Sequence, residues 1–115
     1  MKYIRTKDGR ISYLTSEPNE EVPEYEIITS KGTVAYRMES QVVKIADTIA
    51  ELCDVFVVEN EYCGQVSQSM YSDFEKAKQN IDITSNDVIY GSLRIAGKGI
   101  IYVAKMNEKG ELELL

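Results

Sequence analysis

The chain has 115 residues, of which 43% are hydrophobic and 28% charged, a composition typical of soluble globular proteins and unlike that of disordered chains. A chain of this length buries roughly two thirds of the surface that its unfolded form exposes, so we expect a single domain over residues 1–115. Its net charge of −6, with Lys and Arg scattered along the chain, argues against direct binding of nucleic acid.

The start of the chain and the two cysteines carry no targeting or cofactor signal. The first residues lack the apolar core of a signal peptide, and no apolar run approaches the roughly 18 residues of a membrane span. Cys53 and Cys63 have no His in the chain to complete a zinc set, so we expect plain thiols, with a disulfide or an acid-assisted metal site as alternatives. These features predict a cytoplasmic protein with no cofactor and no membrane segment.

Alternating apolar and polar residues predict two β-hairpins in the first forty residues. In the first turn Asp8-Gly9 supplies the positive φ angle that tight hairpins need, and in the second Gly32 does so. Residues 15–24 carry four Glu, two Pro and one Asn, which predicts an exposed acidic loop. The strands expected to pair are 2–6 with 10–14, and 25–29 with 33–38.

The longest apolar pattern begins at Gln41. Residues 41–45 indicate a strand, 48–53 a short helix and 55–58 a second strand. Thr48 and Glu51 match a capping box at the start of the short helix. The connection of about nine residues is too short for a parallel crossover, so an antiparallel return or a change of sheet is expected. The continuously apolar strand 55–58 is expected to be central, with a helix over it.

A longer helix is predicted over residues 70–81. Its apolar stripe has the spacing i, i+4, i+7 and i+11, and either Ser72, with Glu75 three residues later, or Ser69 is the expected cap. The polar segment 60–69 before it is expected to be a connecting loop. The residues of the stripe are Met70, Phe74, Ala77 and Ile81.

The last third of the chain indicates strands again. After an expected turn at 83–87, a glycine-rich turn at 96–99 predicts a hairpin, and an edge strand is expected at 111–115. The fold class predicted from the whole pattern is α+β: a mainly antiparallel sheet built from hairpins, with one short helix (about 48–53) and one longer helix (about 70–81). The strands of the last hairpin are 88–95 and 100–106.

No motif for catalysis stands out. The absence of His removes the commonest general base and metal ligand, and Gly97-Lys98-Gly99 lacks the spacing and the following helix of a phosphate loop. The best catalytic arrangement is acidic, because the first three of four carboxylates follow one another at i, i+4 and i+7 and hard cations prefer such oxygen ligands. Capping and helix exit explain the same residues without a metal. The four carboxylates are Asp47, Glu51, Asp54 and Glu59.

The eight tyrosines offer a different kind of site. Tyr90 and Tyr102 lie on facing strands of the last predicted hairpin, where tyrosines either pack or, if exposed on one face, bind other proteins. Leu112 and Leu114 lie on the terminal edge strand, where a second copy of the chain is a candidate partner. These four residues form the possible interaction surface.

Two apolar stretches and the opening of the chain carry a resemblance. Residues 49–58, residues 99–115 and the opening 2–9 are similar to small uncharacterised proteins of phages and prophages of Gram-positive bacteria. The resemblance rests on core and turn patterns and carries over no activity and no site residue. It implies the cytoplasm of a bacterial host cell as the setting.

The sequence therefore favours a non-enzymatic protein of phage or prophage type that binds a protein partner or a second copy of itself, with no small-molecule ligand specified. One alternative is an acidic mimic of DNA that occupies a site on a host protein, which requires its nineteen carboxylates to form a stripe. A less favoured alternative is a carboxylate-metal hydrolase that uses the four carboxylates named above.

Overall fold

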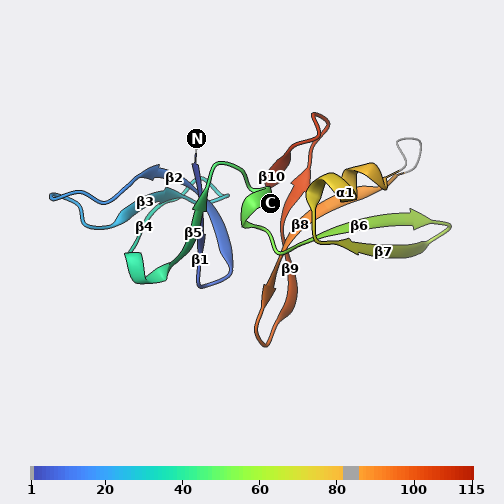
Figure 1. Cartoon of the computed structure of the whole chain (residues 1–115), viewed down its shortest axis with the longest axis horizontal. Coiled ribbons are helices and arrows are strands. Elements are labelled where there is room, and N and C mark those ends of the chain that lie inside the picture. Colours follow the sequence, from blue (N-terminus) through green and yellow to red (C-terminus); the bar gives the residue numbers. More distant parts are fainter. Residues whose placement is uncertain (1, 82–85) are drawn as a thin grey trace. The chain divides into compact units, whose positions relative to one another are not determined.

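Two β-sheets make up the structure, a computed structural model that describes residues 2–81 and 86–115. Within these residues ten strands form two five-stranded, mostly antiparallel sheets, with the orders β4-β3-β2-β1-β5 and β10-β9-β8-β6-β7 (Figure 1). The sheets belong to two compact units, one reaching to Leu52 and the other beginning at Cys53. The expectation of one domain over residues 1–115 stays a prediction.

The first unit is a meander of four strands with a fifth strand added to β1. Both predicted hairpins are present, and the turn glycines Gly9 and Gly32 adopt φ angles of 81° and 83°, which explains why glycine stands there. Residues 17–23 are exposed, as expected for the acidic loop. The elements are β1 Lys2–Thr6, β2 Arg10–Ser16, β3 Tyr25–Ile28, β4 Val34–Arg37, the 3₁₀ turn η1 Glu39–Gln41, β5 Val42–Ala46 and the 3₁₀ turn η2 Ala50–Leu52.

The core of the first unit comes from alternate positions on its strands. Ile4, Leu14 and Ile27 are buried and form one cluster, because successive side chains of a strand point to opposite faces. Partly buried hydrophobic residues from β3, β4 and β5 pack against it: Tyr25, Ala35, Val42 and Ile45.

The second unit contains a helix and five strands. The predicted hairpin of β8 and β9 and the predicted terminal edge strand β10 are confirmed. The turn expected at 83–87 lies largely outside the described residues. The elements are β6 Val55–Tyr62, β7 Gln65–Tyr71, α1 Phe74–Gln79, β8 Val88–Ile95, β9 Gly99–Met106 and β10 Leu112–Leu114.

Strand β6 is interior, as its apolar run predicted. It pairs with β7 on one side and β8 on the other, and its first four residues are all buried. The helix covers one face, where the Phe74 ring lies 5.4 Å from the Phe56 ring and Ala77 is fully buried. Buried side chains of β6, β8 and β9 complete this core: Val58, Ile89, Leu93 and Ala104.

The longer helix predicted over 70–81 is wrong. Residues 65–71 form β7, and α1 contains only six residues, capped by the Asp73 side chain, which accepts a hydrogen bond from Glu75 N at 2.8 Å. The expected loop at 60–69 is instead a hairpin, because Cys63 and Gly64 adopt φ angles of 52° and 78° and close a two-residue turn. The protein is thus mainly β, and the α+β assignment with a longer helix is incorrect.

The short helix predicted over 48–53 shrinks to the 3₁₀ turn η2. The predicted capping box is present: Thr48 N donates to Glu51 Oε2 at 3.2 Å, and Glu51 N donates to Thr48 Oγ1 at 3.3 Å. Only one turn fits, because β6 starts at Val55. Of the two alternatives left open for this connection, an antiparallel return and a change of sheet, the structure has the change of sheet, since β5 and β6 belong to different sheets.

Candidate functional site

Two predicted site residues, Tyr90 and Tyr102, lie in contact. Their rings stack with centroids 4.5 Å apart and planes at 12°. Tyr90 pairs across the strands with Val57, so the stack lies on the face of the second sheet that carries Val57, opposite the helix-covered face. Both tyrosines are half-buried and pack against each other, and a role in binding other proteins stays a prediction.

The Tyr102 hydroxyl belongs to a closed polar network. It donates to Glu59 Oε1 at 2.7 Å, while Gln68 Nε2 donates to the same oxygen at 2.6 Å and to the Tyr102 hydroxyl at 2.9 Å. Glu59 and Gln68 face each other across β6 and β7. Tyr102 therefore reaches from β9 across the sheet face and fixes the side chain of Gln68 on the edge strand.

This network favours a neutral Tyr102. Burial, the hydrogen bond to Glu59 and the negative charge of Glu59 together raise the pKa of Tyr102 from 10.0 to about 12, and burial has the largest effect. Tyr102 is therefore a fixed hydrogen-bond donor, and its hydroxyl loses the proton only in strongly alkaline solution.

Glu59→Gln is expected to lower the pKa of Tyr102 toward 10, because the amide keeps an acceptor but removes the charge. The tyrosinate absorbance titration measures this, with Tyr102→Phe identifying the step that belongs to this residue. Because the folded pKa is raised, the stability from protonated Tyr102 is present below pH 10 and is lost as the pH rises toward 12. An unchanged titration in Glu59→Gln would contradict the role given to the carboxylate.

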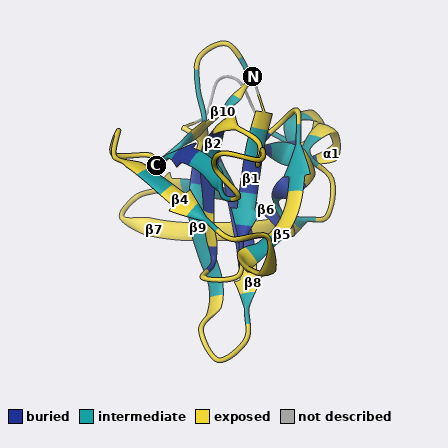
Figure 2. Cartoon of the chain, turned by 90° about the vertical axis from the view of Figure 1, so that its left-hand side faces the viewer, coloured by how far each residue is buried: buried dark blue, intermediate teal, exposed yellow. Residues whose placement is uncertain are grey.

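Next to this network lies the free side of β7, the outermost strand of its sheet. All of its residues except Tyr71 are exposed, and Figure 2 shows the strand as exposed along nearly its whole length. Val66 and Met70 expose 60% and 54% of their surface. They lie on the same face as Gln68, since they are two residues before and two residues after it on the strand. Sequence reasoning missed this strand, although Gly64 and the alternation from Val66 to Met70 indicate it.

The hairpin turn decides which backbone groups of β7 point outward. In a two-residue hairpin the flanking residues, here Tyr62 and Gln65, exchange both hydrogen bonds. The pattern alternates, so the N–H and C=O groups of Val66, Gln68 and Met70 point away from β6. No other strand among the described residues pairs with this side of β7. The strand thus presents an unoccupied row of donors and acceptors.

The other three sheet edges differ from β7 in length or charge. Strand β10 has three residues and contains Glu113, and β4 has four and contains Arg37. Strand β5 contains Lys44 and has a register shift in its pairing with β1. Short length, charge and bulges are the usual protection against edge pairing. Strand β7 has seven residues, no charge, no proline and a continuous register with β6.

The terminal leucines lie apart from the tyrosine pair. Leu112 is half-buried, and its Cδ1 lies 3.3 Å from where a Cβ on Gly91 would stand. Gly91 and Tyr90 are neighbours on β8 and face opposite sides of the sheet, so Leu112 packs on the face opposite the tyrosines. Leu114 is also half-buried. The four predicted residues therefore do not form one surface.

The carboxylates of the hydrolase alternative have partners of their own. Glu51 belongs to the capping box, Asp54 Oδ2 accepts from Arg94 N at 2.8 Å, and Glu59 belongs to the Tyr102 network. Asp47 is exposed. In residues 2–81 and 86–115, no three His, Cys, Asp or Glu side chains are placed to hold a metal ion. The helix that was expected to align these carboxylates does not form.

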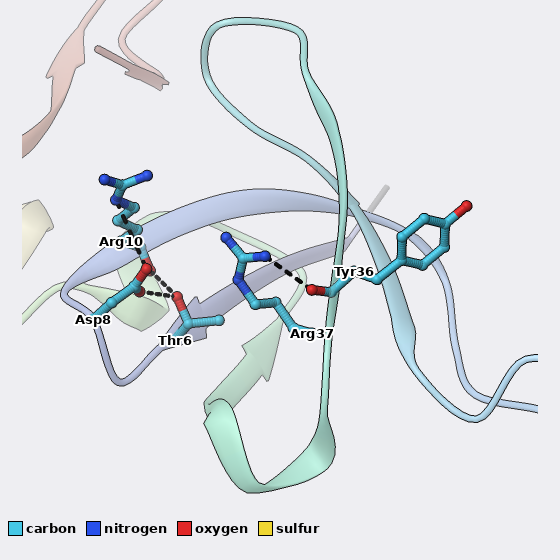
Figure 3. Close-up of polar contacts among 5 residues, drawn as sticks. All are labelled: Thr6, Asp8, Arg10, Tyr36 and Arg37. Carbon is cyan, nitrogen blue, oxygen red and sulfur yellow. Dashed lines mark hydrogen bonds and ion pairs between the residues drawn. The ribbon is translucent and has the colours of Figure 1, made fainter.

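A second polar cluster surrounds the β1–β2 turn of the first unit (Figure 3). Thr6 Oγ1 donates to Asp8 Oδ1, and Arg10 Nε lies 3.7 Å from Asp8 Oδ2 in an exposed ion pair. On β4, Arg37 Nη1 donates to the Tyr36 carbonyl at 2.8 Å, while the Tyr36 ring points away from Arg37 (Figure 3). These contacts are those of a solvent-exposed turn and strand end.

The remaining sequence features add no site. Cys53 is half-buried, Cys63 is exposed in its turn, and neither is in a disulfide. Within the described part of the chain, no helix has the length and apolar character needed to cross a membrane. Comparison of the chain with protein-family models, with curated proteins and with solved structures found no match.

Proposed function

We propose that the protein is a non-enzymatic protein-binding module that receives an extended strand of its partner on the free side of β7. The observation that carries this proposal is the unprotected edge strand β7, whose seven residues include no charge, no proline and no bulge. The other edge strands of the two sheets are short, charged or irregular. An added strand is the natural ligand of such an edge.

The side chains on β7 supply the means of selection. In strand addition the backbone hydrogen bonds give affinity, while alternate side chains contact the partner and give specificity. Val66 and Met70 offer two exposed apolar contacts, separated by Gln68. Because Glu59 and Tyr102 already hold the Gln68 side chain, little of its freedom is lost on binding.

Two further observations support a role without catalysis. The raised pKa of Tyr102 makes that hydroxyl a donor instead of a base, and the four carboxylates of the less favoured hydrolase alternative serve other contacts or lie exposed. The proposed setting is the bacterial cytoplasm during phage or prophage expression, which rests on the resemblance of residues 49–58 and 99–115.

A selection of random displayed peptides against the whole protein tests the proposal without knowledge of the partner. We expect enriched peptides that bind as strands and protect the amides of Val66, Gln68 and Met70 from hydrogen exchange. Val66→Pro removes one outward donor and leaves the pairing with β6 intact, so it should weaken peptide binding about tenfold or more, as measured by fluorescence anisotropy.

Val66→Thr is the matched control, because it keeps the N–H group and the branched shape. It should bind the selected peptides within a few fold of the wild-type protein. Enriched peptides that protect only amides elsewhere in the chain, or a selection without enrichment, would show that β7 is not a strand-binding edge.

A further inference from the structure

We infer that the strand received by β7 is β7 of a second copy, paired antiparallel about a twofold axis at Gln68. The inference rests on the proposed function, because it names the partner of the same edge. It is carried by three features of residues 65–71: a symmetric order of side chains, a matching set of outward backbone groups and the absence of charge.

The order of side chains on β7 is symmetric about Gln68. Ser67 and Ser69 flank it, and the next positions on either side are the apolar Val66 and Met70. Twofold interfaces bring one surface against itself, so they need this kind of self-complementarity. In the antiparallel pair Gln68 faces Gln68 of the second copy, and Val66 faces Met70 of the second copy. Apolar side chains thus meet apolar ones on both sides of the axis.

The backbone groups fit the same register. Gln68 is one of the residues whose N–H and C=O point outward, so the two copies of Gln68 exchange both hydrogen bonds at the axis. Val66 also points outward and pairs with Met70 of the second copy in the same way. A register shifted by one residue would oppose outward groups with inward ones and lose these hydrogen bonds.

Charge favours β7 over β10 and β5 for this pairing. The middle residue of β10 is Glu113 and that of β5 is Lys44, so the same twofold pairing there would set like charges against each other. On β7 the axis passes through a neutral amide. The nearest acids of β6, such as Glu59, would face their copies across three strand spacings, about 14 Å, which is beyond the screening length of roughly 8 Å at physiological salt.

A pair of seven-residue strands is at the small end of protein interfaces, so we expect a dissociation constant in the micromolar range. Light scattering during size-exclusion chromatography at rising protein concentration should show a shift from monomer to dimer. The amides of Val66, Gln68 and Met70 should gain protection from hydrogen exchange over the same concentration range, because they become bonded only in the dimer.

Paired charge substitutions test the register. Val66→Lys with Met70→Lys opposes Lys and Lys across the axis and should abolish the dimer, and the Glu pair at the same positions should do the same. Val66→Lys with Met70→Glu sets opposite charges against each other and should restore it. An equimolar mixture of the Lys pair and the Glu pair should form a heterodimer, although neither forms a dimer alone.

The first unit supplies a matched control. Met38→Lys with Val43→Lys makes the same two changes at residues of similar exposure, 58% and 52%, and should leave the dimer intact. Circular dichroism of every variant shows whether the fold is kept. A dimer that survives the Lys pair, or a mixture that does not associate, would overturn the inference.

A wild-type protein that stays monomeric at millimolar concentration would also overturn it. The proposed function would then stand or fall on the peptide selection alone, because enriched peptides that protect the β7 amides do not depend on self-pairing. The two proposals therefore fail on different measurements.

Discussion

Leu93→Ala is expected to lower the free energy of unfolding of the second unit by about 2–5 kcal/mol, the cost of truncating a fully buried leucine. No part of the Leu93 surface is exposed, and its neighbours on the helix-covered face, Ile89 and Ala104, are fully buried too. These rigid strand positions relax little, so the lost side chain leaves a cavity. Urea unfolding followed by circular dichroism measures the change.

Arg94→Ala is the control for this prediction. Arg94 is the next residue on β8 and is exposed on the other face, and its hydrogen bond to Asp54 comes from the backbone, which the substitution keeps. Its effect should stay within about 0.5 kcal/mol. Equal losses in the two variants would mean that the core of the second unit is not where the structure places it.

Gly91→Ala is expected to destabilise the second unit by about 1–3 kcal/mol through overpacking. A Cβ at this position would lie 2.9 Å from Cys53 Sγ and 3.3 Å from both Ala104 Cβ and Leu112 Cδ1. The contact with Ala104 comes from the neighbouring strand, which cannot move without breaking the β8–β9 pairing. Thermal unfolding of the single variant gives the size of the effect.

The Cys53→Ala background tests which contact limits the space. It removes the sulfur atom nearest to the new methyl group, so Gly91→Ala should cost at least about 1 kcal/mol less there than in the wild-type chain. The same cost in both backgrounds would assign the strain to Ala104 or Leu112 instead.

Three hairpins, β1–β2, β3–β4 and β8–β9, were predictable because residues in their turns signal the turn locally. Gly9 and Gly32 stand where the backbone needs a positive φ angle, and both flanks alternate. The capping box of Thr48 and Glu51 was equally local and is present, although only a single 3₁₀ turn follows it.

The longer helix was mispredicted because Met70 fits both a helical and a strand pattern. Helical spacing joins Met70 to Phe74 and Ala77, while the spacing of two residues in a strand joins it to Val66 and Gln68. The turn at Cys63 was overlooked because a residue other than glycine rarely adopts a positive φ angle. Tertiary pairing with β6 decides for the strand, and local pattern does not record that pairing.

The candidate site could be predicted only in part. The hairpin whose two strands carry Tyr90 and Tyr102 was predictable, but their stacking was not, because a register shift pairs Tyr90 with Lys105 and Tyr102 with Ser92. The partners of the Tyr102 hydroxyl lie 43 and 34 residues away, on β6 and β7, and they depend on the order of the strands. The free side of β7 likewise became visible only once that order was known.

The short strand β10 sets a limit on the growth of the sheet that contains β7. Twofold pairing through β7 would give one ten-stranded sheet with β10 at both ends. Each end would present three residues with Glu113 in the middle, which is a poor template for further strands. Growth of this sheet would therefore stop at two copies, because one of its edges pairs with a strand and the other resists the addition of strands that fibrils require.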